Sequence, residues 1–97
     1  TTFQLKHVID TGDILLQKSV PILPNATTGD LYNELKIVGA ELLIETLDQL
    51  AKGNLLPTPQ QNIEDAAYHA PKIFTETCVI HWNDTSENIH NLIRGLA

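Results

Sequence analysis

The stretch TTGDLYNELKIVGAELLIETLDQLAKG, residues 27–53, is the clearest structural signal in this 97-residue chain. Its apolar side chains recur at the three- and four-residue spacing of one helix face: Leu31, Leu35, Val38, Leu42, Leu43, Leu47 and Leu50. Thr27 and Asp30 form a capping-box pattern at its start, and Gly53 is a natural stop at its end. The pattern predicts a long amphipathic helix that lies on a sheet.

Two short strands are expected before this helix. Residues 2–7 alternate apolar and polar side chains, as a half-buried strand does. A turn with Gly12 follows, and residues 14–22 predict a second strand, antiparallel to the first. Pro21 and Pro24 weaken its far end, because proline cannot donate to a strand ladder.

After the helix, residues 54–72 are loop-like and hold three prolines. Residues 73–82 predict a small hairpin, in which Trp82 is expected to anchor the core or cover a sheet edge. Residues 84–97 predict a second amphipathic helix, with Asp84 and Glu87 in a capping pattern. No linker separates two domains, so we expect one α/β unit that leans on further structure.

Composition narrows the class of function. The net charge is -6 and the six basic residues are dispersed, which argues against a main nucleic-acid contact. No apolar run is long enough to span a membrane, and no signal peptide is visible. The single cysteine, Cys78, allows no internal disulfide and fits a reducing compartment such as the cytoplasm. Because the chain starts with Thr1 inside a predicted strand, we expect a trimmed or excerpted product.

Asp10-Thr11-Gly12 is also the pattern by which aspartic proteases present a catalytic carboxylate, and residues 37–39 superficially match their second motif. Such an enzyme needs two carboxylates that share a proton. Asp13 then stands where a small residue is wanted. Gly39 also falls inside the predicted helix. These two features disfavour a protease.

The longer run IDTGDILLQ, residues 9–17, resembles the folate-dependent formyltransferases, whose pattern is Asp, any residue, Gly, two or three apolar residues and Gln. Later segments match the branch of that family that acts on methionyl-tRNA, in the right order: Lys52-Gly53, Pro59-Gln60, Tyr68 to Ile73, Ile80-His81-Trp82 and Ile93 to Leu96. Ala-Pro-Lys-Ile, residues 70–73, is the most distinctive. His81 and Thr77-Cys78, within the predicted hairpin, depart from the family pattern.

The resemblance implies a fold and an activity. The fold would be the C-terminal portion of a Rossmann-like formyltransferase domain, with a strand pair, a long covering helix, a small hairpin and a terminal helix. Residues 1–83 would form the back part of the catalytic domain, and residues 84–97 a helix leading to the linker towards a tRNA-binding domain. The parent enzyme would transfer a formyl group from 10-formyltetrahydrofolate to the amino group of initiator methionyl-tRNA.

The resemblance also assigns site residues. Asp10 would be catalytic, as a carboxylate that orients a histidine and relays a proton. The backbone of His7, Val8 and Ile9 would contact the pterin, and Gly12 would permit the tight exit from the loop. The residues alone also allow a simpler interpretation, in which Asp10 only shapes a hairpin turn.

Two further patterns indicate no site. Cys78 and His81 have the spacing of zinc ligands, but two side chains do not make a zinc site, so we expect no metal. Asn88-Ile89-His90 spells the family's Asn-x-His, yet it follows Asp10 instead of preceding it and falls within the second predicted helix.

The family carries its Asn-x-His and a Ser-Leu-Leu-Pro run upstream of the catalytic Asp, and these supply the oxyanion-binding Asn and an acid/base His. We therefore expect residues 1–97 alone to be inactive and to self-associate through an unpaired sheet edge. Two alternatives stay open: a related folate-dependent formyltransferase or hydrolase with another amine substrate, and a non-catalytic acidic interaction module.

Overall fold

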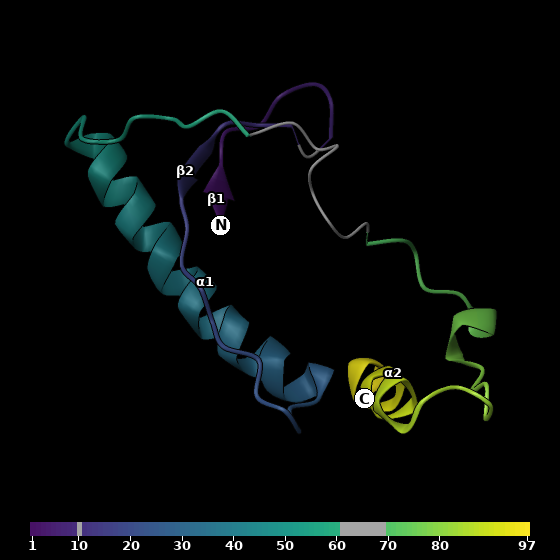
Figure 1. The fold of residues 1–97 in the computed structure, drawn as a ribbon. Helices are drawn as coiled ribbons and strands as arrows, with labels where there is room; N and C mark the ends of the chain where they lie inside the picture. The colour runs from purple at the N-terminus through teal and green to yellow at the C-terminus, as the bar shows by residue number, and fades with distance from the viewer. Residues whose placement is uncertain (10, 61–69) are drawn as a thin grey trace.

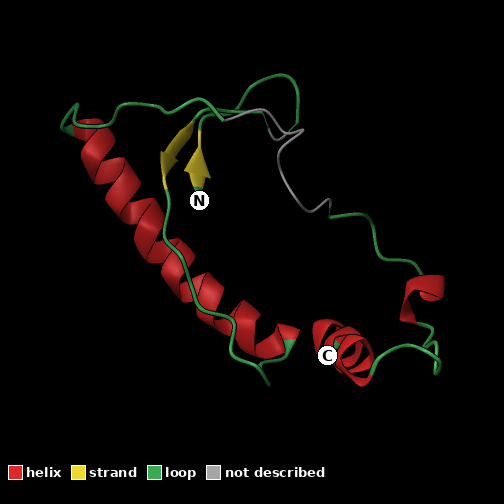
Figure 2. Cartoon of the chain, in the orientation of Figure 1, coloured by secondary structure: helices red, strands yellow, loops and turns green. Residues whose placement is uncertain are grey.

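The computed structural model describes residues 1–9, 11–60 and 70–97. Along the chain these form strand β1 (Thr2–Phe3), strand β2 (Ile14–Leu16), helix α1 (Thr28–Ala51), a short 3-10 helix η2 (Thr75–Cys78) and helix α2 (Ser86–Leu96) (Figure 1, Figure 2). The strands lie beside the C-terminal half of α1. The chain then runs back along α1, and α2 lies at its N-terminal end (Figure 1). The α/β class is confirmed.

Helix α1 begins and ends where the sequence predicts. The Thr27 hydroxyl accepts a hydrogen bond from Asp30 N at 3.2 Å, and Thr27 N donates to Asp30 Oδ2 at 3.0 Å, which completes the capping box. The bond from Thr27 N, and then a bond that the Thr27 hydroxyl donates to Asp30 Oδ2 at 2.9 Å, hold the pKa of the Asp30 carboxyl below its usual 3.8. Gly53 follows the helix with φ of 69°, a left-handed conformation that glycine adopts without strain.

Strands β1 and β2 pair antiparallel, as expected, but they are shorter than predicted. Thr2 lies opposite Leu16 and Phe3 opposite Ile14, with a register shift between the two pairs. The predicted strands covered residues 2–7 and 14–22. A period-two pattern in the sequence marks extended chain, and extended chain becomes a strand only where a neighbour pairs with it.

A third segment pairs with β2 from the other side. Ile14 N donates to Thr58 O at 2.7 Å, and Thr58 N donates to Ile14 O at 2.8 Å. Pro57 and Pro59 flank Thr58, and their backbone nitrogens face away from β2. Because proline has no N–H group, the outer side of this segment offers few hydrogen-bond donors. From the sequence, this stretch is expected only to be a loop. The self-association predicted above therefore applies to the outer edge of β1.

The strands are joined to α1 through a chain of hydroxyl groups. Leu16 N donates to Thr2 Oγ1 at 3.1 Å, which lies 2.8 Å from Thr46 Oγ1. The Thr46 hydroxyl donates in turn to Leu42 O at 2.7 Å. Leu42 and Thr46 are the buried side chains of α1, with 5% and 2% of their surface exposed. This contact fixes the sheet on the helix.

The rest of α1 is far less covered. The chain exposes 8366 Å², whereas a compact protein of 10.7 kDa exposes about 5500 Å². Its radius of gyration is 17.1 Å, against about 12.5 Å for a compact domain of this length. The large apolar side chains of α1 that are about half exposed or more include Leu35, Leu43, Leu47 and Leu50. No described segment covers them.

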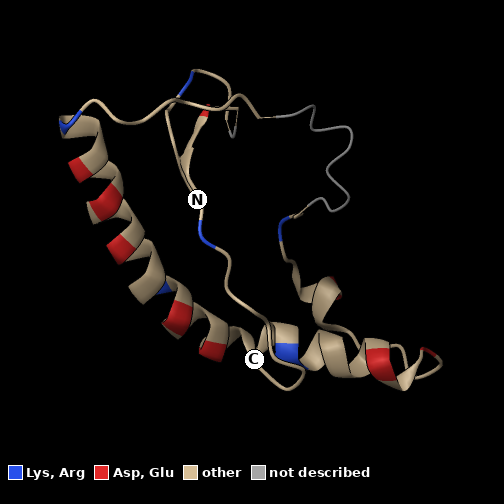
Figure 3. Ribbon diagram, turned by 60° about the vertical axis from the view of Figure 1, so that its left-hand side comes forward, with Lys and Arg blue, Asp and Glu red and all other residues tan. Residues whose placement is uncertain are grey.

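Acidic side chains gather on another side of α1. Asp30, Glu34, Glu41, Glu45 and Asp48 recur at helical spacing and lie within an arc of about 60°. Figure 3 shows this stripe along the outer side of the helix. Negative charge there opposes contact with nucleic-acid phosphate, as the composition indicates. Among the residues that the structure describes, no helix has both the length and the apolar character needed to cross a membrane.

The hairpin predicted for residues 73–82 is wrong. The structure has the 3-10 helix η2 there and no strand anywhere in residues 70–97. The Thr77 side chain accepts a hydrogen bond from Phe74 N at 3.1 Å, and Thr77 N donates to Phe74 O at 3.0 Å. Such local threonine bonds compete with strand pairing. Trp82 is 78% exposed, so its predicted role in the core is wrong as well.

The predicted second helix is present as α2, and its capping differs by one residue. Thr85 is the N-cap, and its hydroxyl accepts from Asn88 N at 3.1 Å. Asp84 instead accepts from Asn88 Nδ2 at 2.8 Å and from Thr85 N at 2.7 Å. These two bonds, the Asn88 one first, lower the pKa of the Asp84 carboxyl.

Candidate active-site loop

The segment between β1 and β2 forms a loop closed at its base. Gln4 N donates to Asp13 O at 2.9 Å, where the two arms of the loop meet. Lys6 Nζ lies 2.7 Å from Asp13 Oδ1, with the two side chains 49% and 27% exposed. A partly exposed ion pair stabilises by about 0–1 kcal/mol, so the backbone bond is at least as important. Residues 5–9 thus protrude from a fixed base.

The tip of the loop is tightened by one side chain. The Thr11 hydroxyl donates to Val8 O at 2.8 Å, a local bond typical of a threonine in a turn. Asp10, the catalytic residue assigned by the resemblance, lies outside the described residues. Its role therefore stays a prediction.

The four predicted folate-binding residues occupy two different places. His7, Val8 and Ile9 are exposed at the tip, with Val8 67% and Ile9 83% exposed. An exposed pair of large apolar side chains offers contact area to an incoming molecule. Gly12 is buried in the base of the loop. The structure therefore brings three of the predicted residues together at an accessible edge and sets the fourth beneath them.

Gly12 is a glycine because two backbones approach closely there. A Cβ at this position would lie 1.7 Å from Gln4 O and 2.9 Å from Phe3 Cδ2. Because no side chain fits, Gly12 lets the loop return tightly onto β1, in agreement with the predicted tight exit.

Gln60 completes the base, although its sequence position does not predict a site residue. Its Nε2 donates to the Gly12 carbonyl oxygen at 2.7 Å, across 48 positions of the chain. Pro59-Gln60 was noted only as part of the family pattern. The prolines around Thr58 are the feature of the sequence that could have indicated Gln60. They leave Thr58 as the residue between them that can pair with β2, and this pairing places Gln60 beside the loop.

No metal centre is found within residues 1–9, 11–60 and 70–97, where no three His, Cys, Asp or Glu side chains lie close enough to hold an ion. Cys78 is exposed in η2, and its thiol lies 3.6 Å from Phe74 O. That the protein needs no metal stays a prediction.

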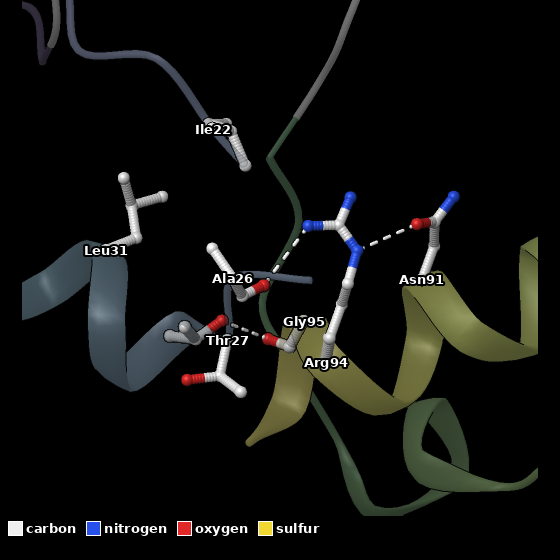
Figure 4. Close-up of a pocket in the computed structure, with 8 residues that line it drawn as sticks. Ile22, Ala26, Thr27, Leu31, Asn91, Arg94 and Gly95 are labelled. Carbon is white, nitrogen blue, oxygen red and sulfur yellow. Dashed lines mark hydrogen bonds between the residues drawn. The ribbon is translucent and has the colours of Figure 1, made fainter. Parts of the chain in front are cut away.

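A shallow pocket of about 190 Å³ lies at the opposite end of α1, where α2 meets the helix start (Figure 4). The Arg94 guanidinium donates to Ala26 O at 3.1 Å, to Leu23 O at 3.4 Å and to Asn91 Oδ1 at 2.8 Å. The pocket is also lined by Ile22, Thr27, Thr28, Leu31 and Gly95. Because Arg94 already binds backbone carbonyls of another segment, its observed role is to fasten α2 to the start of α1.

The competing motifs are accounted for by ordinary structure. Asn88 binds Asp84 just before α2, and His90 Nε2 lies 3.3 Å from Pro24 O in the segment that precedes α1, so both side chains already have structural partners. Gly39 lies inside α1, as predicted, and therefore not in an aspartic-protease loop.

Comparison with known proteins agrees with this geometry. The formyl transferase family model matches residues 1–47, which include β1, the loop, β2 and most of α1. Relatives named methionyl-tRNA formyltransferase align along the chain. That of Porphyromonas gingivalis is 40% identical over 99 residues, that of Phocaeicola vulgatus 42% over 100 and that of Clostridium acetobutylicum 43% over 96.

These alignments take in 99–100% of this chain and 30–31% of each relative. The chain thus spans about a third of the length of the curated relatives it matches. The loop of residues 5–13 falls within the part that the family model covers. Residues 1–47 of this chain are thus similar to the formyl transferase family, and the chain is similar, along its whole length, to one part of the methionyl-tRNA formyltransferases.

Proposed function

We propose that this chain is part of an enzyme that transfers the formyl group of 10-formyltetrahydrofolate to the amino group of initiator methionyl-tRNA. Asp10 is its catalytic carboxylate in this chain, and His7, Val8, Ile9 and Gly12 form the loop that meets the folate. The observation that carries the proposal is end-to-end similarity, at 40–43% identity, to proteins named for this activity.

The reaction needs a carboxylate at the loop for a definite reason. The amine attacks the formyl carbon, the carbonyl oxygen becomes an oxyanion, and the carbon–N10 bond then breaks. One proton leaves the attacking nitrogen and one reaches the departing nitrogen. A carboxylate such as Asp10 holds a neighbouring imidazole in its charged form and passes on that proton. The family's oxyanion donors have no counterpart placed before Asp10 in residues 1–97.

The structure supports the loop as a place for this chemistry. Its tip presents exposed apolar side chains, Val8 and Ile9, to a flat ligand. Its base is held by β1 on one side and by Thr58 and Gln60 on the other. A reacting group gains from such a fixed base, because orientation can contribute several kcal/mol to a barrier.

The test is a formylation assay on the protein encoded by the complete reading frame that contains residues 1–97. Asp10→Asn should lower kcat by about 10²- to 10⁴-fold, the usual contribution of acid–base catalysis. Asp48→Asn, which changes a carboxylate of the exposed α1 stripe, is the matched control and should keep the parent rate. Asp10→Asn with an unchanged kcat would contradict the assigned role.

Two further results bear on the substrate and the parts required. Methionyl-tRNA should be formylated, and a preference for another amine would move the protein to a related folate enzyme. The isolated residues 1–97 should show no turnover, because they hold no second acid–base group at the expected place. Turnover by the isolated chain would contradict this account.

A further inference from the structure

We infer that Gln60 is a positioning residue for the proposed active-site loop, because its side-chain amide holds the backbone of Gly12, two positions after Asp10. This inference rests on the proposed function. Gln60 Nε2 lies 2.7 Å from Gly12 O, and Gly12 is buried.

Gln60 is itself held in place. Two positions earlier, Thr58 exchanges both backbone hydrogen bonds with Ile14, at 2.7 and 2.8 Å. Pro57 and Pro59 on either side have restricted φ angles, which further limits this segment. Gln60 is also only partly exposed, and its bond to Gly12 O is partly buried.

The bond acts at the exit of the loop. On one side, Gln4 N donates to Asp13 O at 2.9 Å. On the other, Gln60 holds the carbonyl of the preceding residue, Gly12. The chain is therefore fixed on both sides at Gly12 and Asp13, two and three positions after Asp10. If the Gln60 amide were lost, Gly12 O would have no bond to it, and the loop exit would be held from β1 by the bond from Gln4 N to Asp13 O.

Side chains of similar size separate donation from packing. Gln60→Leu keeps most of the volume but cannot donate. Gln60→Glu keeps the shape and donates only when its carboxyl is protonated, since a carboxylate would face a carbonyl oxygen. Partial burial beside that oxygen raises the pKa of such a carboxyl above the usual value of about 4.3. Gln60→Glu should therefore behave like the parent at low pH and like Gln60→Leu at high pH.

The experiment uses the protein from the complete reading frame, with kcat and KM measured between pH 5 and 8. Gln60→Leu should lower kcat by about 10- to 100-fold, because about 1 Å of misplacement can cost two orders of magnitude in rate. The KM for methionyl-tRNA should stay within twofold of the parent's. Gln60→Glu should regain activity relative to Gln60→Leu as the pH falls. Gln49→Leu, on α1, is the control and should match the parent.

A second measurement does not depend on activity. Hydrogen–deuterium exchange of a peptide that contains residues 12–16 should be faster in Gln60→Leu than in the parent or in Gln49→Leu. Exchange that is unchanged, or Gln60→Glu and Gln60→Leu with the same activity at every pH, would overturn the inference. Faster exchange in a protein without formylation activity would keep the contact between Gln60 and Gly12 and reject the proposed function instead.

Discussion

Gly12→Ala tests the packing at the base of the loop. The new Cβ would lie 1.7 Å from Gln4 O, while ordinary contact begins near 3.4 Å, so the two backbones would have to separate by about 1.7 Å. The obstacle is a backbone oxygen, which cannot rotate away as a side chain would. Overpacking of this kind costs about 1–3 kcal/mol.

The same separation weakens two hydrogen bonds, from Gln4 N to Asp13 O and from Gln60 to Gly12 O. Each contributes about 1 kcal/mol, so with both bonds lost the free energy of unfolding should fall by about 3–5 kcal/mol in total. Gly39→Ala is the matched control, because a Cβ there has no atom within 4 Å and Gly39 lies inside α1. Alanine is favoured over glycine in a helix by about 0.5–1 kcal/mol.

Urea unfolding of the protein from the complete reading frame, followed by circular dichroism, measures both changes. The unfolding midpoint should fall for Gly12→Ala and rise slightly for Gly39→Ala. A Gly12→Ala protein with the parent's midpoint would contradict the close approach of Gln4 and Gly12, since the loop would then have room that the structure does not give it.

Three other predictions concern the helix, its caps and the sheet edge. Thr46→Val removes the hydroxyl that binds Leu42 O and Thr2 Oγ1, so the free energy of unfolding in urea should fall by about 1–3 kcal/mol. Thr46→Ser keeps the hydroxyl and should lower it less. Equal losses in the two variants would contradict a stabilising role for the chain of hydroxyl groups. The carboxyls of Asp30 and Asp84 have pKa values below 3.8, the value expected in the unfolded chain. The stability that each carboxylate adds is therefore present above pH 3.8 and is lost as the pH falls through the folded pKa. An NMR titration that gives either carboxyl a pKa at or above 3.8 would contradict the hydrogen bonds to it at the start of α1 or α2. The isolated chain should self-associate through the outer edge of β1, and a monomer by light scattering at high concentration would count against this.

The elements that the sequence predicted correctly depend on neighbouring residues. Helix α1 carries its apolar spacing, its Thr27–Asp30 capping box and its Gly53 stop within one stretch, so local signals decide its position. The hairpin predicted at residues 73–82 is wrong because the segment is short and Thr77 closes a local turn instead. A short apolar run does not by itself distinguish a strand from a turn.

The site could be predicted only in part. The loop of residues 7–12 was located from its own pattern, and the structure describes all of it except Asp10. Gln60 and Thr58 could not be assigned, because their contacts join the loop to a segment more than 40 positions away. The close approach of Gln4 to Gly12 is a property of the paired backbones, and a sequence shows only that a glycine is present.

The most direct measurement of the central claim is the sequence of the reading frame upstream of Thr1. The account predicts an in-frame Asn-x-His followed by Ser-Leu-Leu-Pro within the preceding codons, which would make Asp10 the third member of a formyltransferase site. A start codon immediately before Thr1 would contradict it, and the chain would then be better explained as a non-catalytic interaction module.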